Sequence, residues 1–96
     1  MRVVYHPAVQ RDLDAILRYY DTIDPRLADD FWEEFQAFVV LAAEKPTLFH
    51  PGEKGRRRVN LKRFPYHFLF RLFPDRIRIT AVRHHRRNPQ FALGRP

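Results

Sequence analysis

Three histidines and a group of arginines in the second half of the chain are the residues best suited to chemistry. His67, His84 and His85 carry imidazole groups, which can accept or donate a proton near neutral pH. Arginine side chains bind phosphate in a bidentate manner and can offset negative charge that develops on it. The plausible chemistry is therefore the handling of a phosphodiester. The residues expected to contact a nucleic acid or another target are Arg57, Arg58, Arg71, Arg83, His84, Arg86 and Arg87.

The same residues also fit a structural reading. Each histidine could be an ordinary surface residue or a satisfied, half-buried residue of a sheet. The cluster from Arg56 to Arg58 could be the solvated start of a strand or an anion contact. At the level of sequence both alternatives stay open.

No motif for a metal, a thiol or a cofactor is present. His84 and His85 are adjacent and so point to opposite sides of a strand, from which they could not easily bind one metal ion. The chain has no cysteine, which excludes disulfides and thiolate chemistry. It has only three glycines and no glycine-rich phosphate loop. We expect neither a metal nor a cofactor.

Charge is divided unevenly between the two halves of the chain. Residues 1–48 contain five Arg and Lys against nine Asp and Glu, whereas residues 49–96 contain thirteen against two. Fifteen of the eighteen basic residues are arginine. A strongly basic half indicates an anionic partner such as nucleic acid, a ribosome or an acidic protein segment.

The length and composition predict one globular domain over residues 1–96. Hydrophobic residues make up 45% of the chain, and 15% of the chain is aromatic, which is typical of a folded protein. No apolar run approaches the roughly 18–20 residues of a membrane span. The first residues lack the apolar core of a secretory signal. We expect a cytoplasmic protein without a membrane partner.

Two stretches carry apolar residues at helical spacing. The first is expected to begin at Pro7. Its apolar stripe consists of Val9, Leu13, Ile16, Leu17 and Tyr20. The second begins where Asp24 can cap free amides and Pro25 takes the first helical position, and it ends near Lys45. Its stripe consists of Leu27, Phe31, Phe35, Phe38, Val39 and Ala42. The short link between the stretches predicts a helical hairpin.

Short β-rich runs flank the helices and predict the fold class. Residues 2–5 form one run, residues 56–61 a second, and two alternating runs meet at the turn Pro74-Asp75. In the last run we expect Ile77, Ile79 and Ala81 to share one face. The order is β-α-α-β-β-β, an α+β fold in which the helical hairpin packs on one face of a small antiparallel sheet.

Short motifs spread along nearly the whole chain form an ordered set. They are Tyr5-His-Pro-Ala8, Asp12-Leu13 with Ile16, Pro25 with Ala28 and Phe31, Pro46, Arg57-Arg58 with Leu61, Phe64-Pro-Tyr66 and Ala81-Val-Arg-His-His-Arg-Arg-Asn-Pro89. This set resembles the RelE/ParE family of toxins from type II toxin–antitoxin systems, and the final segment is its most specific part. The resemblance implies the same element order.

The RelE-like branch of that family cleaves mRNA in the ribosomal A site. By resemblance, His85, His67 and Arg58 would be the catalytic residues. Arg58 keeps a basic residue on the second strand, and His85 falls on the position past the last strand. Asn60 stands where a lysine is often found, His67 where an arginine is expected, and Phe91 replaces a terminal tyrosine.

The ParE-like branch lacks that catalytic set, and its characterised members poison DNA gyrase. The Phe-Pro-Tyr entry at Phe64 and the His-x-Arg-Arg-x-Pro exit that ends at Pro89 look closer to this branch. The favoured hypothesis is therefore a gyrase-binding toxin without hydrolytic activity. The alternatives are a ribosome-dependent mRNA endonuclease and a non-toxic nucleic-acid-binding domain on the same scaffold.

The resemblance also implies a cognate antitoxin. Its C-terminal segment would wrap the toxin and lay a helix or strand against the hairpin and the sheet, giving a toxin–antitoxin hetero-oligomer. We expect Trp32 and Arg78 to contact it. Trp32 lies beside the apolar stripe of the second helix, which suits either a partly buried edge residue or a partner-binding anchor.

Overall fold

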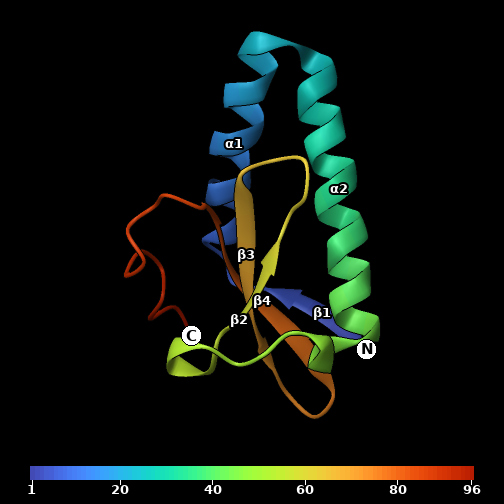
Figure 1. Cartoon of the computed structure of the whole chain (residues 1–96), viewed down its shortest axis with the longest axis vertical. Helices are drawn as coiled ribbons and strands as arrows, with labels where there is room; N and C mark the ends of the chain where they lie inside the picture. Colours follow the sequence, from blue (N-terminus) through green and yellow to red (C-terminus); the bar gives the residue numbers. More distant parts are fainter.

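The computed structural model describes all 96 residues and shows the predicted order of elements (Figure 1). The helices are α1 (Val9–Ile23) and α2 (Pro25–Glu44). The strands are β1 (Arg2–Tyr5), β2 (Arg57–Asn60), β3 (Tyr66–Leu72) and β4 (Arg76–His84). Two short 3-10 turns, Pro46–Leu48 and Glu53–Gly55, lie between α2 and β2. The prediction of an α+β fold is confirmed.

Helix α1 begins two residues later than predicted. Pro7 lies in a turn, and the first helical residue is Val9. The reason is His6, whose Nδ1 accepts a hydrogen bond of 3.0 Å from the backbone amide of Ala8. The imidazole thus satisfies an amide that precedes the helix, and Val9, Leu13 and Ile16 then face the core, as their spacing predicts.

Helix α2 begins and ends where its signals predict. The Asp24 carboxylate accepts a hydrogen bond of 2.9 Å from the amide of Arg26, and Pro25 is the first helical residue. The helix ends at Glu44, because Pro46 disfavours helical geometry before it. Neither α1 nor α2 combines the length and the apolar character that crossing a lipid bilayer requires.

The sheet has four strands in the order β1-β4-β3-β2. Strands β2, β3 and β4 form the predicted antiparallel meander. Strand β1 pairs with β4 in parallel, with Val3 opposite Ile77, so the sheet as a whole is mixed. The expectation of an antiparallel sheet is corrected in this one strand. The helical hairpin leads the chain to β2 at the opposite edge, where it runs in the same direction as β1, and the two turns of the meander then leave β4 parallel to β1.

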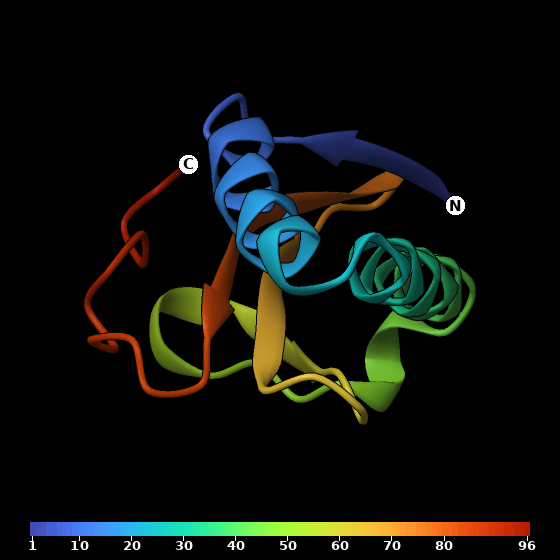
Figure 2. The same ribbon diagram turned by 90° about the horizontal axis from the view of Figure 1, so that it is seen from above.

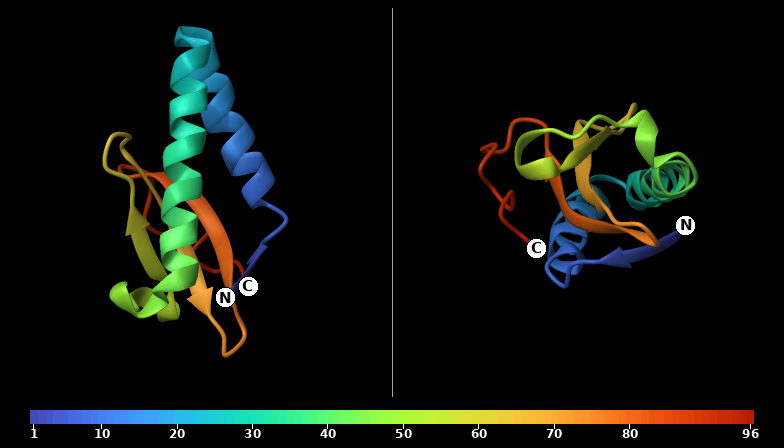
Figure 3. Two further views of the ribbon diagram at one scale, coloured as in Figure 1. Left: turned by 90° about the vertical axis from the view of Figure 1, so that its right-hand side faces the viewer. Right: turned by 90° about the horizontal axis from the view of Figure 1, so that it is seen from below.

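The helical hairpin covers one face of the sheet, and the core lies between the two layers (Figures 2 and 3). Helix α2 supplies Phe31 and Phe35, and the sheet supplies Phe68, Phe70 and Ile79, all of which are fully buried. The tip of the hairpin extends beyond the strands (Figure 3, left). The other face of the sheet is covered by the last part of the chain.

A β-bulge at Thr80 reverses the alternation of β4. Opposite β3, Leu69 pairs with Ala81 and Phe70 pairs with Ile79, so Thr80 is one extra residue on β4. Ile79 faces the helices, but Ala81 packs with Leu69 on the opposite face. The prediction that Ala81 shares a face with Ile79 is wrong for this reason. The bulge also sends Arg83 to the face away from the helices.

Residues 85–96, here called the tail, lie across the sheet face that the helices leave free. Leu93 of the tail packs on Leu69 and Ala81 in a small second core. We call this surface the tail-side face of the sheet. By strand alternation and the bulge it carries Arg58, Asn60, His67, Leu69, Arg71, Arg78, Ala81 and Arg83.

The tail is held to α1 where β1 ends. Strand β1 stops opposite Ile79, so the amide of Val82 has no strand partner on that side. The Asp12 carboxylate accepts this amide at 3.1 Å and also pairs with the Arg95 guanidinium at 2.6 Å. Arg95 in turn donates to the carbonyl of Thr80 at 3.2 Å. Together Asp12 and Arg95 substitute for the missing strand.

Candidate functional site

Four basic side chains from β2, β3, β4 and the tail meet on the tail-side face. We call Arg58, His67, Arg83 and His85 the histidine cluster. Arg83 of β4 pairs with His67 of the neighbouring strand β3, and its Nε–H donates a hydrogen bond of 2.8 Å to Nε2 of His67. The Nδ1 atoms of His67 and His85 lie 3.0 Å apart, with the rings 9° from parallel. Nη2 of Arg58 lies 3.3 Å from Nδ1 of His85.

Solvent exposure increases along the histidine cluster, from two buried members to two exposed ones. His67 is 2% exposed and Arg83 is 8% exposed, whereas His85 and Arg58 lie on the surface. Burial, reinforced by the charges of Arg58 and Arg83, lowers the pKa of His67 to about 3. Burial and the charge of Arg58 also lower the pKa of His85. Both rings are therefore neutral at pH 7.

Arg83 is largely buried, although it also lines the cavity between α1 and the tail. Its Nη1 donates to the carbonyl oxygens of Pro89 and Phe91, at 2.8 and 2.7 Å, while its Nε binds His67. Burial lowers its pKa from the ordinary arginine value. Nη1 of Arg83 thus holds the tail on the sheet, and contact of Arg83 with a target stays a prediction.

The other predicted contact residues divide into two groups. Arg57 and Arg71 are half-buried and bind backbone carbonyls, of Phe49 at 2.5 Å and of Pro96 at 3.0 Å. The exposed group consists of Arg58, Arg86 and Arg87. The structure therefore brings a smaller set of arginines to the surface than the sequence predicts.

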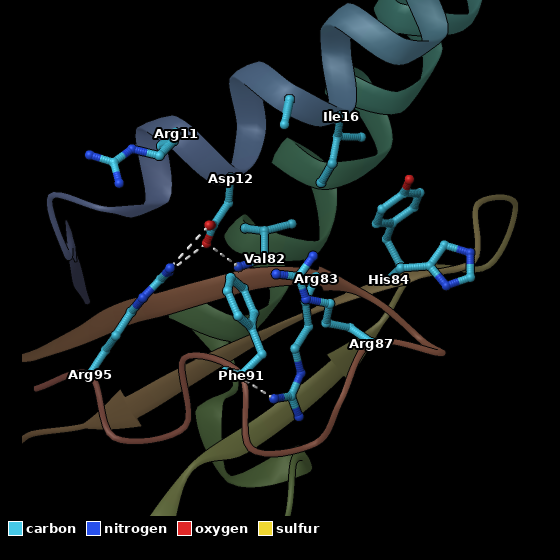
Figure 4. A pocket seen from close by; sticks show the side chains of 11 residues that line it. Arg11, Asp12, Ile16, Val82, Arg83, His84, Arg87, Phe91 and Arg95 are labelled. Atoms are coloured by element: carbon cyan, nitrogen blue, oxygen red, sulfur yellow. Dashed lines mark hydrogen bonds and ion pairs between the residues drawn. The ribbon is translucent and has the colours of Figure 1, made fainter.

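His84 and His85 point to opposite sides of the sheet, as their adjacency predicts. The His84 ring packs edge-on against Tyr66 at 5.0 Å, and its Nδ1 accepts the amide of Arg86 at 3.0 Å. His84 faces a cavity of about 460 Å³ between α1 and the tail (Figure 4). His84 and His85 therefore belong to different sites.

The cavity beside His84 has a basic rim. Figure 4 shows Arg11 and Arg87 on opposite sides of it, with the Asp12–Arg95 pair between them. The Arg87 guanidinium stacks over the ring of Phe91 at 3.8 Å. Because Asp12 is already paired, its charge does not offset the rim. Sequence reasoning missed the pairing of Asp12 with Arg95, since 83 positions separate them and no spacing rule links them.

Trp32 and Arg78, the expected antitoxin contacts, lie in different places. Trp32 is 41% exposed and lines a groove between α1 and α2 with a volume of about 600 Å³. The apolar lining of the groove comes from both helices, with Leu13 and Leu17 of α1 facing Ala28 and Trp32 of α2. Arg78 is half-buried on the tail-side face of β4 and does not line this groove. The structure does not bring the two residues together.

No three His, Cys, Asp or Glu side chains are grouped so that they could hold a metal ion. The chemistry of the tail-side face is thus that of guanidinium and imidazole groups. Such groups bind anions through charge and through N–H donors.

The low pKa of His67 makes stability depend on pH. The folded state keeps His67 neutral down to a pKa of about 3, whereas the unfolded chain takes up a proton near the ordinary value of 6.5. The free energy of unfolding should therefore fall by about 1.4 kcal/mol for each pH unit below 6.5, or about 2 kcal/mol by pH 5. Urea denaturation at pH 7 and pH 5 measures this loss.

The variant His67→Gln is the control for the pH effect. Glutamine cannot titrate, so this variant should lack the contribution of His67 and keep only the smaller contributions of other groups, including His6 and His85. An equal loss of stability in the variant and the parent between pH 7 and pH 5 would show that His67 is not the source.

Comparisons with known proteins identify the family of the chain. Residues 3–89 match the family model described as the ParE toxin of type II toxin–antitoxin system, parDE. Toxin ParE2 of Mycobacterium tuberculosis is 32% identical over 89 residues, which are 92% of this chain and 85% of that protein. The solved structure of the chromosomal ParDE TA system from P. aeruginosa has a similar fold. Its TM-score is 0.77 at 24% identity, with 88% of this chain and 95% of that chain covered. The chain belongs to the ParE toxin family of type II toxin–antitoxin systems.

Proposed function

We propose that this protein is the toxin component of a type II toxin–antitoxin system and that it inhibits DNA gyrase by binding, without hydrolytic activity of its own. A cognate antitoxin neutralises it in the cytoplasm by forming a hetero-oligomer. The observation that carries this proposal is the match to the ParE toxin family over residues 3–89. The similar fold of a chain from a solved ParDE system supports it.

The histidine cluster supports the non-hydrolytic reading over the mRNA endonuclease. His67 is buried and neutral, and Arg83 is occupied by the tail. Buried beneath the tail, His67 cannot reach a phosphodiester without displacement of the tail. The exposed arginines, by contrast, are suited to binding an anionic surface. Complementary charge increases both the rate of association and its specificity.

A supercoiling assay tests the proposed target. Purified protein should reduce supercoiling by gyrase, and premixing it with the antitoxin should restore supercoiling. The proposal of gyrase as target is wrong if supercoiling is unchanged while translation extracts contain cleaved mRNA. If cells that express the chain without its antitoxin grow normally, both toxin readings fail and the non-toxic nucleic-acid-binding domain takes their place.

Two single arginine variants indicate whether the basic exit contacts the target. Arg86 is exposed and follows the last strand, while Arg26 is exposed at the start of α2. Both changes to alanine remove one positive charge. Weaker inhibition by Arg86→Ala than by Arg26→Ala would support contact at the exit. Equal inhibition would mean that the exit does not contact the target.

The groove between α1 and α2 is the proposed docking site of the antitoxin. Both helices contribute apolar residues to it, and Trp32, which lines it, has 41% of its surface exposed. A second, smaller hollow with Tyr5 and His6 adjoins Trp32. An amphipathic helix of the antitoxin would place its apolar residues in this groove, and charged residues such as Arg18 and Asp29 would line its sides.

Replacing Trp32 by alanine should weaken antitoxin binding. A tryptophan anchored in a groove contributes about 2 kcal/mol or more to a protein interface, so the dissociation constant should rise roughly 30-fold. Titration calorimetry with the antitoxin measures this change. Val40→Ala is the matched control, because Val40 is 53% exposed on the same helix but does not line the groove. Equal affinities of the two variants would place the antitoxin elsewhere.

A further inference from the structure

In the histidine cluster the donor and the acceptor of each hydrogen bond are fixed, beginning with Arg83 as the first donor. The guanidinium of Arg83 has donors and no acceptor, and it stays protonated at all ordinary pH values. Its Nε donates to Nε2 of His67, which must therefore be the unprotonated nitrogen of that ring. A neutral imidazole carries one N–H, so the proton of His67 lies on Nδ1.

The direction continues from His67 to His85. Nδ1 of His67 lies 3.0 Å from Nδ1 of His85 and donates to it. Nη2 of Arg58 approaches the same nitrogen of His85 at 3.3 Å. Nδ1 of His85 is thus an acceptor of two donors, and the proton of the neutral His85 ring lies on Nε2.

This order cannot reverse. Reversal would require Nε2 of His67 to donate to Arg83, which has no acceptor. A proton on Nδ1 of His85 would face the N–H of His67 at 3.0 Å and the positive charge of Arg58. A general base needs a free lone pair, and the single lone pair of His85 is already occupied.

We propose that Arg83 and His67 are positioning residues that keep the proton of His85 on Nε2, so that His85 and Arg58 donate hydrogen bonds to a bound oxyanion and His85 does not act as a general base. This inference does not depend on the identity of the cellular target. It assigns the exposed end of the histidine cluster as an anion-binding site and its buried end as the support of that site.

Arg58 has the free donors that such a site needs. Its guanidinium carries five N–H groups. Its Nε binds the side-chain oxygen of Asn60 at 2.7 Å, and Nη2 binds His85, which leaves three N–H groups unused. The titratable and charged groups around the two rings are Arg58 of β2 and Arg83 and His84 of β4. The positive charges of Arg58 and Arg83 favour an anionic ligand.

Nitrogen NMR on the full chain with labelled histidine tests the proton positions. At pH 7, long-range correlations should show His85 protonated on Nε2 only and His67 protonated on Nδ1 only. A proton on Nδ1 of His85, in a neutral or a doubly protonated ring, would overturn the proposal. This measurement uses the unmodified protein and so does not depend on the folding of any variant.

Two substitutions separate positioning from simple packing. His67→Phe keeps the ring volume and removes the hydrogen bonds, so His85 should populate both neutral forms and its pKa should rise. His67→Gln offers an oxygen to Arg83 and an N–H to His85, and it should restore the Nε2-protonated form. A ring of His85 that behaves identically in all three proteins would refute the positioning role.

Anion binding has its own measurement. Inorganic phosphate should shift the Nε2–H resonance of His85, and Arg58→Ala should abolish the shift, with sodium chloride of equal ionic strength as the control. Acetate in a parallel titration distinguishes a carboxylate ligand from a phosphoryl ligand. The absence of a shift with both anions would disprove the anion-binding site.

Discussion

Phe31→Ala should lower the free energy of unfolding by about 3–5 kcal/mol, because it removes a fully buried aromatic ring from the centre of the core. Phe31 packs α2 against the start of β3. Its ring contacts Phe35 at 6.4 Å, Phe64 at 5.4 Å and Tyr66 at 5.5 Å between centroids. Urea denaturation at pH 7 measures the loss. Single domains are stable by about 5–15 kcal/mol in total, so the variant should be close to unfolding.

Phe38→Ala is the control for Phe31→Ala. Phe38 belongs to the same helix but is only partly buried at the edge of the core. Phe38→Ala should lower the free energy of unfolding clearly less than Phe31→Ala, because fewer contacts are lost and solvent can fill the space. An equal loss in both variants would contradict the central place that we assign to Phe31.

Asp12→Ala should lower the free energy of unfolding by about 3–5 kcal/mol, because it leaves a largely buried guanidinium without its partner. The Asp12 side chain is 6% exposed, and that of Arg95 is 18% exposed. The variant also leaves the amide of Val82 without an acceptor. Thermal and urea denaturation should both show the loss, and proteolysis of the tail should become faster.

The neighbouring carboxylate provides the comparison for Asp12. Asp14 is exposed on the same helix and accepts only a hydrogen bond from Gln10, at 2.9 Å. Asp14→Ala should change stability by no more than about 0.5 kcal/mol. The double variant of Asp12 and Arg95 should cost less than the sum of the single variants. Additive losses would show that the two side chains are not coupled.

Local signals in the sequence predicted the elements well. The cap at Asp24, the proline at Pro25 and the break before Pro46 each act within a few residues, and the structure confirms them. The turn at Pro74-Asp75 also joins two strands as predicted. Such features depend on backbone chemistry near one position, which a single sequence contains in full.

Features that depend on distant partners were not predictable in the same way. The bulge at Thr80 arises from the pairing register of β4 with β3, and the alternation of residues in β4 does not predict it. The burial of Arg83 follows from that bulge and from the tail. The prediction named Arg83 as a target contact and did not include its hydrogen bonds to the tail.

The candidate site was predicted in part. The sequence indicated that His67, His85 and Arg58 belong together as candidate site residues, and the structure places all three on the tail-side face. It could not indicate that His67 would be 2% exposed or that it would touch His85. Both facts follow from the folding back of the tail over β3 and β4.

The parallel pairing of β1 with β4 has a consequence for synthesis. The first strand finds its only neighbour in residues 76–84, near the other end of the chain. Contacts between such distant segments form late, because a long loop must close before they contribute. While the ribosome is still translating the middle of the chain, α1 and α2 have no finished sheet to pack against. The tail-side face, with its histidine cluster, is therefore assembled only after β4 and His85 have emerged.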